Sequence, residues 1–104
     1  MAGLLVLKPG TDWTVGGGLF DWTLEFLAQN LSEPEAVQHV REIIDNNLGT
    51  LWLAELSPAA RREAITQLRE HVVEAGEREL PSGEQKPAVI QRLHELAEMA
   101  RQLE

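Results

Sequence analysis

The sequence predicts an all-α fold: a small four- to five-helix bundle or an orthogonal α-domain with an extended N-terminal arm. Apolar residues recur at helical spacing in almost every segment after residue 18. Several of these segments follow residues that favour helix starts, such as serine and proline. The polar connections between them have lengths that are usual between packed helices. Because each segment is apolar along one side, the helices are expected to pack against one another.

The N-terminal segment differs from the rest, so residues 1–18 are predicted to form the arm and residues 19–104 the helical domain. Residues 3–7 are a short apolar run, and the Lys-Pro-Gly sequence that follows at residues 8–10 is typical of a turn. The run is either an edge strand or an extended arm. Three consecutive glycines at residues 16–18 predict a flexible hinge between the arm and the domain.

Two helices are predicted in the first half of the domain, over residues 19–31 and 33–47. Ser32 precedes the second helix and Glu35 follows three residues later, which is the spacing of a capping box. Gly49 can end this helix in the left-handed conformation. The apolar stripes that the two helices are expected to bury are Leu19, Trp22, Thr23, Phe26 and Leu27, then Val37, Val40, Ile43, Ile44 and Leu48.

Residues 50–56 form the most apolar stretch of the chain. Seven residues are too few for periodicity to separate a buried strand from a short buried helix. The helical neighbours on both sides favour a short helix.

Two further helices are predicted in the second half, over residues 58–75 and 87–102. Ser57 can cap the first of them with its side-chain oxygen, and Pro58 suits the first helical position because it lacks an N–H group. Gly76 is expected to end that helix.

The chain has 104 residues, which suits one domain, and a formal net charge of −8. Residues 1–56 hold eight acids against two bases, while residues 57–104 hold nine acids against seven bases. A negative surface repels phosphate groups, so neither nucleic acid nor an anionic membrane is an expected partner. We predict a cytoplasmic location because the sequence contains neither a signal-peptide pattern nor an apolar run long enough to cross a membrane. Arginine exceeds lysine by seven to two, which is typical of GC-rich bacterial genomes.

No constellation in the sequence predicts catalysis, a metal or a cofactor. The chain has no cysteine, which excludes disulfides, thiolate zinc sites and cysteine nucleophiles. His39, His71 and His94 each have an acidic residue three or four positions away, which indicates surface ion pairs, and none follows the Glu-x-x-His spacing of bundle di-metal sites. The serines stand at predicted helix starts or turns, where capping explains them. We therefore expect a protein that is not an enzyme.

The three tryptophans are the remaining candidates for a functional role. Trp22 and Trp52 fall on apolar faces and are predicted to be core residues. Trp13 stands in the polar, glycine-rich arm. It either folds back onto the bundle, which is the favoured interpretation, or anchors a partner, since aromatic residues dominate binding hot spots.

The leading hypothesis is a small acidic, non-enzymatic protein-interaction domain that binds a basic protein partner. Immunity proteins and antitoxins that neutralise basic toxins share this size and charge, which is an analogy of class alone. One alternative is a self-associating structural or regulatory protein that forms a homodimer through the arm. A second alternative is a small-ligand-binding helical bundle with a pocket lined by Trp22, Trp52 and a histidine. The candidate partner-binding residues are Trp13, Asp21, Glu25, Glu35, Glu42 and Asp45.

Overall fold

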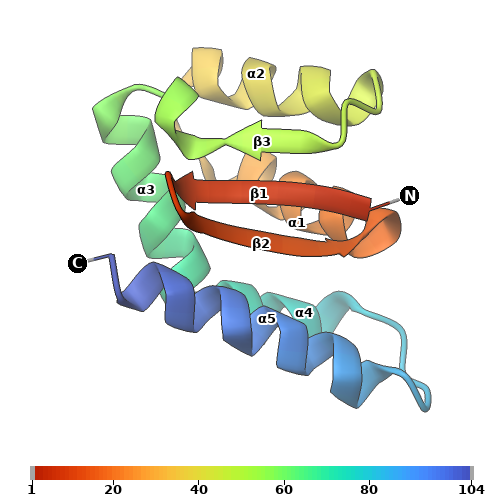
Figure 1. Cartoon of the computed structure of the whole chain (residues 1–104). Coiled ribbons are helices and arrows are strands. Elements are labelled where there is room, and N and C mark those ends of the chain that lie inside the picture. The colour runs from red at the N-terminus through yellow and green to blue at the C-terminus, as the bar shows by residue number, and fades with distance from the viewer. Residues whose placement is uncertain (1, 104) are drawn as a thin grey trace.

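The computed structural model describes residues 2–103 and has an α+β fold, with five helices and a three-stranded mixed sheet (Figure 1). The predicted all-α fold is therefore wrong. In chain order the elements are β1 (Ala2–Lys8), β2 (Thr11–Gly16), α1 (Gly17–Asn30), α2 (Pro34–Asp45), β3 (Thr50–Trp52), the 3-10 turn η1 (Leu53–Glu55), α3 (Pro58–Glu70), α4 (Val72–Glu79) and α5 (Lys86–Arg101).

The segment that the sequence predicted as an extended N-terminal arm instead forms two strands of the sheet, β1 at its centre and β2 at one edge. The strand order is β2-β1-β3, with β1 antiparallel to β2 and parallel to β3. The turn between β1 and β2 contains Gly10, whose φ of +87° favours glycine. A near-continuous apolar run such as that of β1 is typical of a strand that is paired on both sides and buried.

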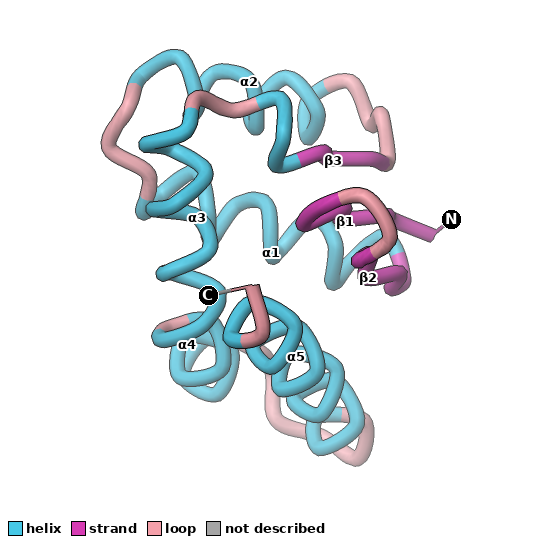
Figure 2. The backbone as a smooth tube through the Cα atoms, turned by 60° about the vertical axis from the view of Figure 1, so that its left-hand side comes forward, coloured by secondary structure: helices cyan, strands magenta, loops and turns pink. Residues whose placement is uncertain are grey.

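The two faces of the sheet differ in their surroundings. Leu5 of β1 pairs with Trp13 on one side and Leu51 on the other, and all three are at most 1% exposed. Successive residues of a strand point to opposite faces, so Val6 and its register partners Asp12 and Trp52 belong to the other face. Figures 1 and 2 show α1 behind the sheet, and none of the helices between residues 2 and 103 lies over its front.

Helix α1 lies directly on the inner face of β1. An ideal Cβ at Gly3 would stand 2.0 Å from Cγ of Phe20, so the helix reaches this position because the strand has no side chain there. Phe20, which is not part of the apolar stripe predicted for this helix, is consequently a core residue at 2% exposure.

Residues 50–56, for which a short helix was favoured, form β3 and then η1. Parallel pairing with β1 through Leu5↔Leu51 buries Leu51 and leaves its neighbour Trp52 on the opposite face at 44% exposure. The predicted core position of Trp52 is therefore wrong.

The helix predicted over residues 58–75 is two helices, α3 and α4, that meet at His71. His71 has φ −127° and ψ −18°, which interrupts the helix. Gly76, the predicted helix end, instead lies inside α4 against α5: a Cβ there would stand 2.4 Å from Cδ1 of Leu93. The Ser57 cap is confirmed, since its hydroxyl accepts a hydrogen bond from the N–H of Ala60 at 3.1 Å.

The predicted capping box before α2 is wrong. The residue at the cap position is Glu33, and its side chain makes no capping hydrogen bond. Ser32 instead donates its hydroxyl and backbone N–H to the carboxylate of Glu63 on α3, both at 2.8 Å. The Ser32 hydroxyl, which the local pattern predicted as the helix cap, is therefore used in a tertiary contact with Glu63.

Candidate functional site

The outer side of α2 presents three acidic residues, Glu35, Glu42 and Asp45, which we call the α2 acidic face. All three are exposed. Their spacing of seven and then three residues places them along one side of the helix. The opposite side of α2 buries Ala36, Val40 and Ile43. Helical amphipathicity thus both fixes α2 on the core and turns these three carboxylates outward.

The charge of the α2 acidic face is not balanced by neighbouring cations. Arg41 is the one arginine or lysine on α2, and its guanidinium is bound to Glu25 of α1, with Nη1 2.5 Å from Oε1. Between residues 2 and 103, no lysine or arginine side chain lies within ion-pair distance of the three acids. Glu42 accepts a hydrogen bond from Gln38 at 3.3 Å, and a neutral amide leaves its charge in place.

Acidic residues of the C-terminal half behave differently. Glu95 pairs with Arg92 at 2.7 Å, and Glu98 is bound to Arg101. Glu70 pairs with Arg69 at 2.6 Å, and this hydrogen bond holds the pKa of the Glu70 carboxyl below its usual value. Glu77 and Glu84 are exposed without an ion pair, but most described acids of this half lie beside an arginine, whereas α2 carries three exposed acids with none.

The other predicted partner-binding residues lie in three different settings. Asp21 is exposed on α1. Glu25 is half-buried and held by Arg41 between α1 and α2, which makes it a structural ion pair. Trp13 is 1% exposed, and its indole N–H donates to the backbone oxygen of Arg92 at 3.0 Å. Trp13 thus stands in the core, where no partner can reach it.

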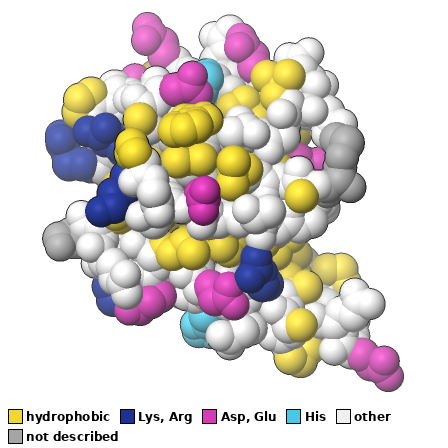
Figure 3. Space-filling model, in the orientation of Figure 1, with side chains coloured by type: hydrophobic (Ala, Val, Ile, Leu, Met, Phe, Trp, Pro, Cys, Tyr) yellow, Lys and Arg dark blue, Asp and Glu magenta, His cyan; other side chains and the backbone are white. Residues whose placement is uncertain are grey.

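The front of the sheet carries an apolar centre that sequence reasoning missed. The outward-facing residues, which we call the open sheet face, are Leu4, Val6, Asp12, Thr14, Thr50 and Trp52. Register places Val6 between Asp12 and Trp52 in one row, and Leu4 in the next. Val6 is only 4% exposed yet stands outside the main core cluster, which fits a position on this second face. In Figure 3 hydrophobic side chains gather on the front of the molecule, with acidic side chains along its upper edge.

A contact between α2 and η1 joins the open sheet face to the α2 acidic face. Nε2 of His39 lies 3.6 Å from Oε1 of Glu55. His39 stands between Glu35 and Glu42 on α2, and Glu55 follows Trp52 by three residues. This contact places α2 beside η1, which follows the strand that carries Trp52.

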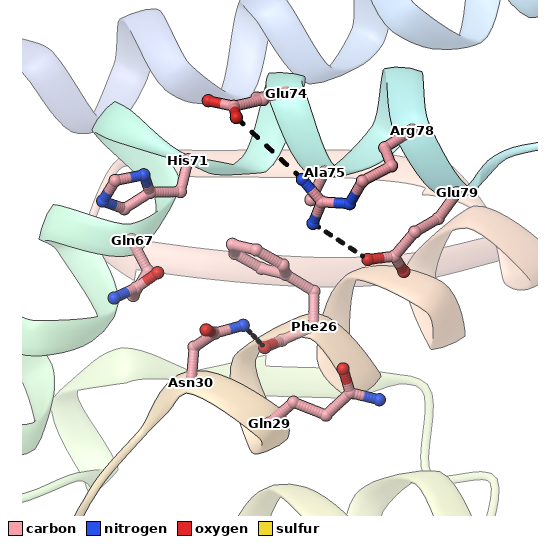
Figure 4. Close-up of a pocket in the computed structure, with 9 residues that line it drawn as sticks. All are labelled: Phe26, Gln29, Asn30, Gln67, His71, Glu74, Ala75, Arg78 and Glu79. Atoms are coloured by element: carbon pink, nitrogen blue, oxygen red, sulfur yellow. Dashed lines mark hydrogen bonds and ion pairs between the residues drawn. The ribbon is translucent and has the colours of Figure 1, made fainter.

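A separate groove of about 400 Å³ opens between α1, α3 and α4 on the other side of the fold (Figure 4). Phe26 and Ala75 form its apolar floor, and polar groups surround them. Arg78 reaches Glu79 at 3.4 Å and Glu74 at 4.0 Å. An anion entering the groove would have to displace these carboxylates. The remaining lining residues are Gln29, Asn30, Gln67 and His71.

The ligand-pocket hypothesis required Trp22 and Trp52 to line one pocket, but the two tryptophans do not meet in this groove. Trp22 stacks on Phe26 with ring centroids 5.9 Å apart and packs against the core. Trp52 stands on the open sheet face, and neither indole lines the groove. Within residues 2–103, no group of three or more histidine and acidic side chains is placed to hold a metal ion.

No protein-family model matches this chain, and no curated protein and no solved structure matches it significantly. Among the described helices, none combines the length and the apolar character that a bilayer span requires.

Proposed function

We propose that this protein is a small, non-enzymatic protein-interaction domain that binds a basic protein partner through the α2 acidic face. The observation that carries the proposal is the set of exposed carboxylates on α2 that have no cation beside them. Charges of one sign on a surface attract a partner of the opposite sign and speed its association. The chain's net charge of −8 extends that attraction beyond the contact itself.

Immunity proteins and antitoxins of basic toxins remain the class-level analogy for this proposal. We place the complex in the cytoplasm, in line with the sequence-based expectation. The alternative of a homodimer formed by an exchanged arm is withdrawn, because the segment is the central strand β1.

The test compares two double variants that change the charge equally. Glu35→Gln with Glu42→Gln removes two charges from the α2 acidic face. Glu77→Gln with Glu84→Gln removes two exposed charges from the α4–α5 region at the opposite end of the fold (Figure 1). A partner is captured from cell lysate at low salt and purified, and its association rate with each variant is then measured from low to high ionic strength.

We expect the rate to fall steeply with salt, because surface charges are screened within about 10 Å at 0.1 M. The α2 double variant should associate about threefold more slowly or worse at low salt, and the control pair should change the rate much less. A rate that ignores both salt and the α2 substitutions would reject the α2 acidic face as the steering surface.

A further inference from the structure

The open sheet face has the properties of a contact surface in its own right. Among the described residues, helices cover only the inner face of the sheet, and no layer lies over the outer face (Figure 2). Trp52, on the β3 side of this face, is 44% exposed and is one of two large hydrophobic side chains that the described surface leaves open. Tryptophan is the residue type most often found as a binding hot spot, because it buries a large rigid area.

We propose that this face docks an amphipathic basic helix of the partner, which seats its apolar side on the exposed Trp52 and the half-buried Leu4. The inference rests on the proposed function, since it names the part of the partner that the same surface binds.

Charge decides the occupant. Asp12 flanks the apolar centre on the β2 side, and Glu55 with the α2 acidic face flanks it on the β3 side. A helix lying along the strands would therefore meet carboxylates on both flanks, which match basic residues beside its apolar stripe. A second copy of this chain, also at −8, would bring acid against acid.

The dimensions of the face fit a helix. The seven residues of β1 extend about 20 Å, which is the length of a helix of roughly fourteen residues. The three strands together are about 10 Å wide, which is close to the diameter of one helix. Pairing of a partner strand is the weaker geometry. The β3 edge has only three residues, and at the β2 edge the Arg92 guanidinium already donates to the backbone oxygen of Thr14.

The probe is a synthetic fourteen-residue peptide of leucine and lysine, with leucine at helical spacing along one side. The control is a peptide of the same composition with a scrambled sequence, which has the same charge but no continuous apolar side. Binding to the full chain is measured by calorimetry. The tryptophan emission spectrum is recorded in parallel, because an indole that leaves water shifts its emission to the blue.

Three variants assign the surface. Trp52→Ser should weaken binding of the patterned peptide at least about tenfold and remove the emission shift. Asp12→Asn should weaken binding a few-fold at low salt only. Leu48→Ser is the matched control: Leu48 is the other exposed large hydrophobic residue, at 62%, and it stands in the loop before β3. It should leave binding unchanged.

The outcomes separate this inference from the proposed function. Equal binding of the scrambled peptide, or unchanged binding of the patterned peptide to Trp52→Ser, would overturn docking on the sheet. If the α2 double variant still lost binding in that case, the α2 acidic face would remain the proposed partner site. Failure of both peptides to bind at low salt would count against both proposals. A dimer of the chain alone in light scattering, lost in Trp52→Ser, would show that a second copy covers the face and would overturn the basic helix.

Discussion

Two residues of α3 with opposite surroundings test where the core lies. Leu68 is fully buried, whereas Arg62 is exposed. Leu68→Ala should lower the free energy of unfolding by about 2–5 kcal/mol, because it leaves a cavity that the packing cannot fill. Arg62→Ala should change it by less than about 0.5 kcal/mol. Urea denaturation of the two variants measures both, and equal losses would show that α3 turns another side to the core.

The Ser57 hydroxyl makes one hydrogen bond that the local sequence predicts and one that it does not. Its hydroxyl accepts from the N–H of Ala60 and donates to Oε2 of Glu33 at 2.7 Å, so it both caps α3 and ties it to the segment before α2. Ser57→Ala should cost about 1 kcal/mol of stability. Ser82→Ala, an exposed loop substitution, is the control and should cost almost nothing. The cap was predictable because it uses adjacent residues, whereas the bond to Glu33 depends on the tertiary fold.

At the scale of elements, the contact of α1 with β1 rests on one glycine. Gly3→Ala would place a Cβ within 2.0 Å of Phe20 Cγ, so the helix or the strand must move. We expect a loss of about 1–3 kcal/mol, as in other overpacked cores. Gly18→Ala is the control, because it adds a methyl with nothing within 4 Å in a helix that alanine favours. Thermal unfolding should rank Gly18→Ala at or above the unmodified protein; a neutral Gly3→Ala would mean that α1 does not rest on β1.

Most of the helical segments were predictable from the sequence, apart from the break at His71, and the strands were not, for physical reasons. A helix of twelve residues such as α2 repeats its apolar spacing often enough to be recognised, and its outward carboxylates follow from the same spacing. In β1 both Leu5 and Val6 are buried, so no alternation of apolar and polar residues shows. The outward position of Trp52 depends on register with a strand more than forty residues away, which no local pattern encodes. The acidic part of the candidate site was therefore predictable from the sequence, whereas the apolar part on the open sheet face was not.

At the scale of the whole molecule, β1 holds the two halves of the sheet together. The strand order β2-β1-β3 means that β2 and β3 make no ladder with each other. Leu5 and Leu7 also belong to the core cluster that the helices share. The N-terminal strand is therefore an internal support of the fold, although it lies at the beginning of the described chain.

Deleting residues 2–8 should consequently abolish cooperative folding and leave no intact helical domain. The deletion takes hydrogen-bond partners from both remaining strands and uncovers the inner side of α1, so the apolar area left in the core cannot offset the conformational entropy of ordering the chain. The control inserts Gly-Ser in the exposed segment 81–85, which joins α4 to α5 at the surface and should tolerate it. Far-UV circular dichroism with urea titration distinguishes the two: the insertion should keep one sharp transition and the deletion should show none. A deletion variant that unfolded as sharply as the full chain would refute the supporting role of β1.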